Sequence, residues 1–594
     1  MKMKRFNLIP LALTTLMLGA CSSEDGLNLG NGSSVAQGEK GYISFSLNLP
    51  AVKGMANRAN DVFDDGDAAE YNVKDATLLL FSGANEGEAT FAGAYPLTLT
   101  DGTSDGDNIT TTYQITQAVT KPTGNNDKVY AMVIINGKAG NVLTGDANTS
   151  WSIKGQELTA STKYKDLAGA AYNLSNTDVA NIASTADGGC FLMTNAPLYT
   201  QAGGVSNPTT GTGGSVQTLT EINPNNIFTT KEEAKANPAA NVYVERAVAK
   251  VTVTGNTTGN KADDNIANYE IKGWTLDVTN KSSYLVRNVN GADWWGLKAD
   301  GVNDYRFVGA AAVADGLYRT YWGIDPNYST EGTFTTQAGT IPASLKTVGA
   351  NDYCLENTFN LTQMKDDQTT RVIVAAALDL DGNGTADDFY VLDNDKSNTA
   401  LTLEDIKNTI KAAYLANGTV VGLLKANLKP DPDQSIGAED LDVTFDQKAT
   451  TGGYVTVSEI TINEASASKF KTGAIPEGLQ AANNDPIIAD VNAAHKIAYY
   501  KGGVSYYPVM IKHFGDDLTP WNNGEVYGSN NADFLGRYGV LRNNWYSINV
   551  TGIKNIGDPE VPKVYGTPDD PSESWISVTI NILSWAKRSQ SVDL

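Results

Sequence analysis

Apolar and small polar residues alternate along the first strand-like segment of the chain. Between residues 42 and 49 every second side chain is apolar, and serine or asparagine lies between them. The apolar positions are Ile43, Phe45, Leu47 and Leu49. This period of two predicts a β-strand with one buried face, which Pro50 ends.

The same alternation returns close to the C-terminus, where serine, threonine and asparagine separate Ile576, Val578, Ile580 and Ile582. Two strands at opposite ends of the chain therefore present the same kind of face, and one could occupy a groove that the other has left. The alternative is that residues 576–583 form the last core strand of their own domain. The pattern alone does not say whose sheet this strand joins.

Further strand patterns follow at irregular spacing, and helical patterns are few. The clearest strands are 76–81, 129–135, 190–193, 242–254, 274–278, 371–378, 389–392, 454–462, 504–512 and 545–553. Val129–Ile135 is apolar on both faces and is expected to be a central strand. The best helix is 403–415 with Thr402 as its N-cap, and 163–172 is a weaker one. Strands without regular helical crossovers predict a mostly β fold of antiparallel sandwiches, with a domain boundary near residue 255.

The N-terminus carries an export signal. A positive leader and a short apolar run end in Leu-Gly-Ala directly before Cys21. This order resembles a bacterial lipobox, in which residues 1–21 form the signal peptide and Cys21 receives the lipid. An ordinary secretory peptide with a chance cysteine is the alternative. Residues 22–40 are polar and glycine-rich, as expected for a flexible tether.

Arg58 is the only arginine between Arg5 and Arg246. It stands in a linker of small and polar residues directly after the first predicted strand. One interpretation is a unique site for an arginine-specific protease, which would cut between Arg58 and Ala59. The other is a compositional accident in a stretch that uses lysine.

Composition limits the chemistry. A length of 594 residues predicts several domains, and a net charge of −23 argues against binding nucleic acid or an anionic membrane through a basic patch. Apart from Cys21, the cysteines are Cys190 and Cys354, which could pair in an oxidising compartment but are better interpreted as two buried thiols. His495 and His513 lack zinc-ligand spacing, and no nucleotide-binding or nucleophile motif is present. We therefore expect neither an enzyme nor a cofactor.

Two weaker candidates for binding remain. Asp379, Asp381, Asn383 and Asp387 have the spacing of a calcium loop, but Tyr390 stands where the final glutamate is needed, and a turn-rich loop explains the segment equally well. Five tryptophans could form a sugar-stacking platform on the surface, although most tryptophans in β proteins pack in or near cores. They are Trp294, Trp295, Trp521, Trp545 and Trp575.

Several segments together resemble the fimbrillin family of Bacteroidales type V pili, most closely the shaft subunit of the short, or minor, fimbria. They are the leader, the strand Tyr42–Leu49 followed by Arg58, and the segments Val244–Val251, Tyr353–Thr358, Arg542–Ile548 and Trp575–Leu594. The similarity consists of islands. Residues 256–350 and 395–490 show little beyond composition, and the loop at 379–388 has no counterpart in the family pattern.

The resemblance implies two tandem antiparallel β-sandwich domains of Greek-key, transthyretin-like topology, at residues 59–255 and 256–574, with few short helices. It also implies a propeptide at 22–58 and a C-terminal donor-strand tail at 575–594. Such a precursor is exported through the periplasm, held in the outer membrane by its palmitate-bearing lipid, and cleaved after Arg58. Its partners are identical or related subunits of an adhesive surface fimbrium and the protease. The alternative is a monomeric glycan-binding surface lipoprotein.

Overall fold

The computed structural model is an elongated molecule, and it is mostly β, with 40% of the described residues in strands and 21% in helices. It describes residues 36–50, 66–100, 102–104, 110–123, 128–146, 148–169, 174–202, 215–259, 268–289, 306–313, 316–329, 334–395, 400–431, 434–514, 519, 531–569 and 576–584. The predicted β class with antiparallel pairing is confirmed. None of the helices within these ranges is long and apolar enough to cross a membrane.

The N-terminal part contains a nine-stranded sheet with the order β3-β2-β6-β13-β17-β1-β5-β4, and β16 also pairs with β6. Its strands are β1 Lys40–Pro50, β2 Ala76–Gly83, β3 Thr90–Pro96, β4 Thr103–Ser104, β5 Thr110–Thr120, β6 Lys128–Ile135, β13 Met193–Asn195, β16 Thr220–Ile222 and β17 Asn241–Arg246. Thr120 of β5 donates its backbone N–H to the hydroxyl of Tyr95 of β3 at 3.0 Å. The edge strand β3 therefore also contacts β5 in the other half of the sheet, and the two halves share one hydrophobic core.

The middle part is a sandwich of two sheets. One has the order β25-β18-β34-β35 and the other β19-β26-β33. The bounds are β18 Val248–Gly255, β19 Asn268–Asp277, β25 Asn351–Leu355, β26 Arg371–Asp379, β33 Val504–Met510, β34 Asn544–Ile553 and β35 Ile576–Ser584. Buried residues of both sheets, among them Val251, Ile548, Trp274 and Val374, form a second core.

The predicted strand 242–254 is divided between these two parts. β17 belongs to the N-terminal sheet and β18 to the middle sandwich, with Ala247 between them. The change of sheet therefore falls at Ala247, whereas the sequence placed the domain boundary near 255. A similar break at Thr456 divides the predicted strand 454–462, because the chain passes there from the middle region into a further lobe.

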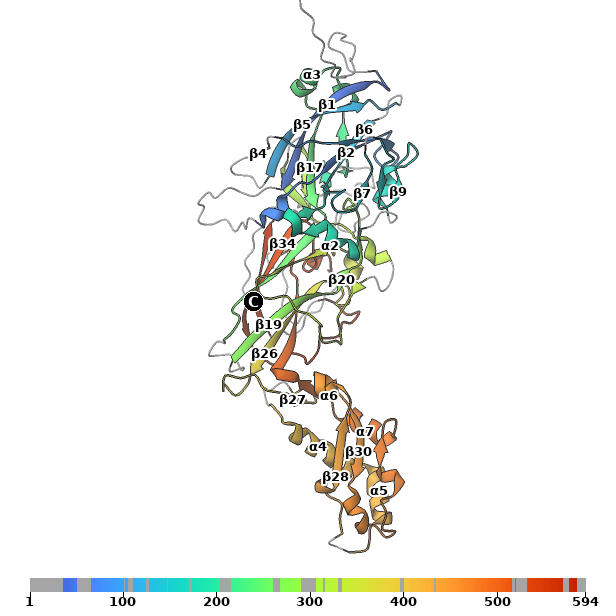
Figure 1. Cartoon of the computed structure of the whole chain (residues 1–594), viewed down its shortest axis with the longest axis vertical. Helices are drawn as coiled ribbons and strands as arrows, with labels where there is room; N and C mark the ends of the chain where they lie inside the picture. The colour runs from blue at the N-terminus through green and yellow to red at the C-terminus, as the bar shows by residue number, and fades with distance from the viewer. Residues whose placement is uncertain are drawn as a thin grey trace, which may run out of the picture.

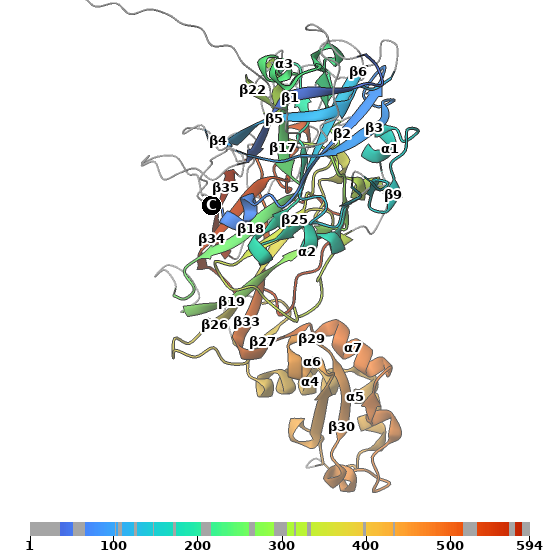
Figure 2. The same cartoon turned by 45° about the horizontal axis from the view of Figure 1, so that its top comes forward.

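That lobe lies at the far end of the molecule from the N-terminal sheet (Figures 1 and 2) and has its own core. Its elements are α4 Leu403–Ala416, α5 Gly418–Asn427, β28 Leu441–Phe445, β30 Val457–Ile462, β31 Ala481–Ala482 and α7 Pro486–Ala494. Three short strands join it to the sandwich, namely β27 Phe389–Leu392, β29 Gly453–Val455 and β32 Ile497–Tyr500. The predicted helix 403–415 is α4. Thr402 caps it, since the hydroxyl of Thr402 accepts from the backbone N–H of Asp405 at 3.2 Å.

The remaining α-helices and strands of the described chain are short. They are β7 Leu143–Thr144, β8 Ser152–Ile153, β9 Gln156–Glu157, α1 Tyr164–Ala168, β10 Leu174–Ser175, α2 Val179–Ile182, β11 Ala183–Ser184, β12 Cys190–Phe191, β14 Leu198–Tyr199, β15 Val216–Gln217, α3 Lys231–Ala236, β20 Thr279–Asn280, β21 Ser282–Ser283, β22 Val308–Ala312, β23 Tyr318–Thr320, β24 Phe334–Thr335 and α6 Lys448–Thr451. Of the weaker predicted helix 163–172, the described residues form only the five-residue helix α1, and residues 170–172 lie outside the described residues.

Candidate functional site at the first strand

β1 is an interior strand of the N-terminal sheet. On one side it pairs antiparallel with β5 along its whole length, from Lys40 opposite Thr120 to Pro50 opposite Thr110. On the other side it runs parallel to the start of β17, from Ser46 opposite Asn241 to Asn48 opposite Tyr243. β1 therefore supplies the only direct link between β5 and β17 in the order of the described sheet.

The backbone just before β17 extends this second edge. The N–H of Tyr42 donates to the carbonyl of Phe228 at 2.7 Å. The N–H of Ala239 donates to the carbonyl of Ser44 at 2.7 Å, and the N–H of Ser46 donates to the carbonyl of Ala240 at 3.1 Å. Strand partners thus satisfy β1 on both edges, and its departure would leave two facing rows of backbone donors and acceptors without partners.

The predicted apolar face of β1 is buried in the N-terminal core. Ile43, Phe45, Leu47 and Leu49 are 0%, 1%, 0% and 3% exposed. At roughly 1.5–3 kcal/mol for each large apolar side chain, these four residues contribute on the order of 6–12 kcal/mol before conformational entropy is counted. The groove under β1 is therefore strongly apolar.

The opposite face of β1 is buried as well, which corrects the expectation of a single buried face. Ser44, Ser46 and Asn48 are at most 9% exposed. The side chains of β5 meet them. The amide of Gln114 donates to the hydroxyl of Ser46 at 2.8 Å, and the hydroxyl of Thr112 donates to the side-chain oxygen of Asn48 at 2.8 Å. Burial of the polar face follows from the interior position, which the alternation itself did not reveal.

The C-terminal strand β35 has a different position. It pairs antiparallel with β34 of its own chain, from Ile553 opposite Ile576 to Asn544 opposite Ser584, and it is the last strand of its sheet. Val578, one of the four alternating aliphatic residues, is 5% exposed and belongs to the middle core. In this subunit the strand takes the place that the second interpretation gave it, inside its own domain.

The described chain resumes at residue 66, eight positions beyond Arg58, and is soon anchored at the junction of the two sheets. The carboxylate of Glu70 is fully buried and lies 2.8 Å from Nζ of Lys250 on β18. Lys250 also lies over the ring of Trp545, with Nζ 3.7 Å from the ring centroid. Tyr353 of β25 donates its hydroxyl to Glu70.

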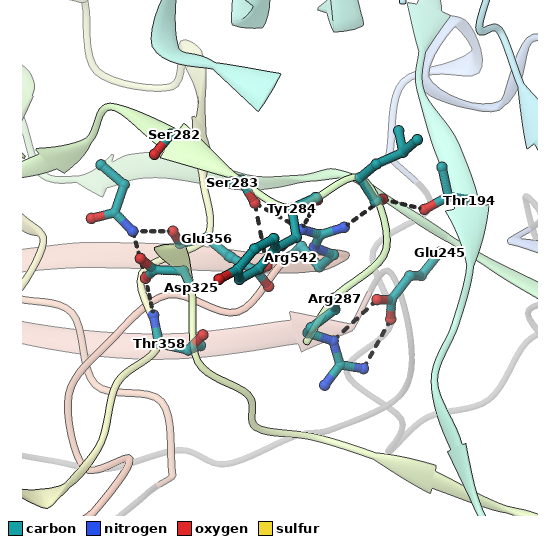
Figure 3. A network of polar contacts seen from close by, with 12 residues as sticks. Thr194, Glu245, Ser282, Ser283, Tyr284, Arg287, Asp325, Glu356, Thr358 and Arg542 are labelled. Atoms are coloured by element: carbon teal, nitrogen blue, oxygen red, sulfur yellow. Dashed lines mark hydrogen bonds and ion pairs between the residues drawn. The ribbon is translucent and has the colours of Figure 1, made fainter. Parts of the chain in front are cut away.

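A second polar network crosses the same junction (Figure 3). Arg287 donates Nε and Nη2 to the two oxygens of Glu245 at 3.1 Å each. Arg542 donates Nη2 to Glu356 at 2.6 Å. Asp325 accepts from Asn280, from Asn327 and from the backbone N–H of Thr358, and burial raises the pKa of this carboxyl to about 7.

Sequence reasoning missed these buried ion pairs, although a signal was present. Charged residues interrupt otherwise apolar strand patterns at Glu245, Lys250, Glu356 and Arg542. These positions lie in three of the segments that carry the fimbrillin resemblance, and the structure brings those segments together at one junction.

Several other residues singled out from the sequence lie outside the part of the chain that the structure describes. They are Cys21, Arg58, Ala59, Trp294, Trp295, Trp521 and Trp575. Trp545 is 8% exposed and donates its indole N–H to Thr252, so it is not a surface platform. Cys190 and Cys354 are buried free thiols, as the preferred interpretation stated, and burial raises the pKa of both.

The Asp379 loop connects β26 to β27, which lie in different sheets. Both carboxylate oxygens of Asp379 accept backbone N–H groups, from Gly382 at 2.8 Å and Gly384 at 2.9 Å. The amide of Asn383 donates to Asp381 at 2.9 Å and to Asp387 at 3.4 Å. The side chains thus hold the turn itself, and within the described chain no three acidic, histidine or cysteine side chains are grouped as metal ligands.

Comparisons with known proteins point to one family for the C-terminal part. Residues 498–591 match the family model described as the C-terminal part of fimbrillin, the major fimbrial subunit protein type IV. This range contains β33, β34 and β35. No curated protein matches the chain.

Several solved structures are similar over most of the chain. A cell adhesion protein from Parabacteroides distasonis is 12% identical, with 92% of this chain and 100% of that chain covered and a TM-score of 0.34. A fimbrilin from Porphyromonas gingivalis is 12% identical, with 92% and 99% covered and a TM-score of 0.30. A cell adhesion protein from Bacteroides eggerthii is 13% identical, with 93% and 98% covered and a TM-score of 0.30.

Proposed function

We propose that the chain is a structural subunit of surface fimbriae that assembles when β1 is replaced by a strand of a neighbouring subunit. It is exported as a lipoprotein anchored through Cys21, and an arginine-specific protease cleaves it after Arg58. The supporting observation is the interior position of β1, which lies between two strands and covers an apolar groove. The family match at residues 498–591 agrees with this role.

Cleavage controls assembly because it changes β1 from a tethered segment to a separate peptide. In the precursor, the short connection from Pro50 to the described chain at residue 66 keeps β1 at a high effective concentration, on the order of millimolar or more. An external strand cannot compete with it easily. After cleavage at Arg58, β1 can dissociate and does not return at low concentration.

The donor is proposed to be the C-terminal segment 575–594, with Ile576, Val578, Ile580 and Ile582 facing the groove of the next subunit. β35 has one strand neighbour at present, β34, whereas β1 has two. A strand that moves from this edge into the groove therefore gains a second ladder of backbone hydrogen bonds. The contact is head-to-tail and does not close on itself, so it yields a filament.

The first experiment determines the N-terminus of protein taken from the cell surface. A start at Ala59 in the fibres, and lipid-bound monomers without fibres from Arg58→Ala, are expected. A blocked N-terminus at Cys21 and a monomer of unchanged size after arginine-protease treatment would contradict the proposal. They would favour the monomeric glycan-binding lipoprotein.

The second experiment locks β1 in place. Ser46 and Gln114 are opposite each other in the register of β1 and β5, and their side chains already touch at 2.8 Å. The double variant Ser46→Cys/Gln114→Cys is expected to form a disulfide that holds β1 after cleavage. Cleaved subunits should stay monomeric until a reductant is added, and each single-cysteine variant is the matched control. Fibre growth by the oxidised double variant would overturn the groove assignment.

A further inference from the structure

A small cavity of about 30 Å³ lies at the junction between the N-terminal sheet and the middle sandwich. Its charged lining includes Glu245 of β17, Arg287, Arg319 of β23 and Arg542. The segment Leu541–Asn544, which leads into β34, forms another side. Four parts of the chain that are far apart in sequence therefore meet around one small space. Figure 3 shows Glu245, Arg287 and Arg542 in this region.

Two guanidinium groups at the cavity each have a nitrogen donor without a hydrogen-bond partner among the described residues. Arg287 uses Nε and Nη2 on Glu245 and the carbonyl of Thr320, but its Nη1 has no hydrogen-bond partner in the described chain. Arg542 uses both Nη atoms, and its Nε likewise lacks a partner among the described residues. Both side chains are at most 2% exposed, so bulk water does not satisfy these donors.

The acidic residues at this place pair with the arginines. Both oxygens of Glu245 accept from Arg287, and Oε1 of Glu356 is paired with Arg542, whereas Oε2 of Glu356 has no hydrogen-bond partner among the described residues. Arg319 is a third cation, and its guanidinium lies over the ring of Tyr243 at 5.8 Å, with no ion pair to a described carboxylate. Three arginines therefore face two glutamates, which leaves one positive charge in excess, and Arg287 and Arg542 are buried whereas Arg319 is half-buried.

We propose that the cavity binds one small monovalent anion of the chloride class. An anion would accept the spare N–H groups of Arg287 and Arg542 and would offset the charge of Arg319. The volume is large enough for a halide. Water is the competing occupant, but it cannot neutralise the excess charge.

The anion would connect the two sheets. Glu245 belongs to β17, whereas Arg542 lies two residues before the start of β34 in the middle sandwich. A ligand bound only by the folded state raises the folding equilibrium constant by the factor 1 + [L]/Kd. Above Kd, each tenfold rise in chloride should therefore raise that constant roughly tenfold.

The dependence of the folding equilibrium constant K on chloride is measured by denaturant unfolding of the full chain. The ionic strength is held constant, with gluconate replacing chloride. The slope of log K against log [chloride] should approach one for the wild type. It should fall to near zero for Arg319→Gln, which removes the excess charge at a half-buried position. Lys272→Gln, an exposed change far from the cavity, is the control and should keep the wild-type slope.

Crystallography of the wild-type protein is a second test, which does not depend on whether Arg319→Gln folds. Wild-type crystals grown in bromide should give an anomalous peak in the cavity, in contact with Nη1 of Arg287. A cavity without anomalous signal, filled by water alone, would overturn the proposal. An equal chloride slope in wild type and Arg319→Gln would overturn it as well.

Discussion

β1 and β35 have the same alternation of apolar and polar residues but different places in their sheets. β1 lies between β5 and β17, and both of its faces are buried. β35 pairs with β34 alone, at the end of a four-stranded sheet. The strand nearest the expected cleavage site is therefore the more deeply embedded of the two.

The difference shows what a period of two can and cannot report. Alternation fixes which side chains face a core, because successive residues point to opposite sides of a strand. It does not fix the number of strand neighbours, which depends on pairing with segments more than a hundred residues away, such as β17. Under the proposed function, the embedded strand is the one that leaves and the edge strand is the one that moves.

The largest expected effect is the loss of stability when a buried side chain of β1 is truncated. Phe45→Ala should lower the free energy of unfolding of the unprocessed chain by about 3–5 kcal/mol, because the ring is 1% exposed in the N-terminal core. The measurement is urea unfolding before and after arginine-protease treatment. If β1 leaves after cleavage, the two processed proteins have the same stability. A persistent difference would mean that β1 stays bound.

Much of this arrangement was accessible from the sequence. The face of β1, the central strand at 129–135, the helix at 403–415 and the strand segments of the sandwich were predicted from local periodicity. The junction was not, because Glu70, Lys250, Glu356 and Arg542 acquire their roles only through partners distant in sequence. The lobe around α4 was also missed, since mixed helices and short strands give no uniform pattern over residues 395–490.

The second effect is a change of stability with pH, and it tests whether the sheets that contain β1 and β35 unfold together. Burial raises the pKa of Asp325 to about 7 at the junction, from an ordinary value of 3.8. The folded state then binds more protons than the unfolded chain between about pH 4 and 7, so stability should fall as pH rises through this window and level off above it. The loss amounts to roughly 2–4 kcal/mol.

Asp325→Asn should reduce this pH dependence, whereas Asp381→Asn in the exposed loop should leave it unchanged. Denaturation is followed by probes placed in each sheet. If both probes report the same pH dependence, the junction couples the N-terminal sheet to the middle sandwich. A dependence confined to the middle sandwich would show that β1 and β35 belong to independently unfolding parts.

A third effect concerns the edge strand. Val578→Ala removes two methyl groups from a side chain that is 5% exposed, which should cost roughly 1.6 kcal/mol at about 0.8 kcal/mol per group. The loss should appear in the unassembled subunit, because β35 packs on its own sandwich there. A stability equal to wild type in the monomer, together with weaker fibres, would place Val578 only in the groove of a neighbour.

The smallest expected effect concerns the polar face of β1, where Ser46 accepts from the amide of Gln114 at 2.8 Å. Gln114 is exposed, so its amide finds water when the serine hydroxyl is removed. Ser46→Ala should therefore cost only about 0.5–1.5 kcal/mol, much less than Phe45→Ala. A double-mutant cycle with Gln114→Ala isolates the pair, and we expect a coupling below about 1 kcal/mol. That result would assign the stability of β1 to its apolar face and its backbone ladders, features that any alternating donor strand can reproduce. A coupling well above this value would mean that the polar face holds β1 specifically. A donor with serine and threonine in other positions would then replace it poorly.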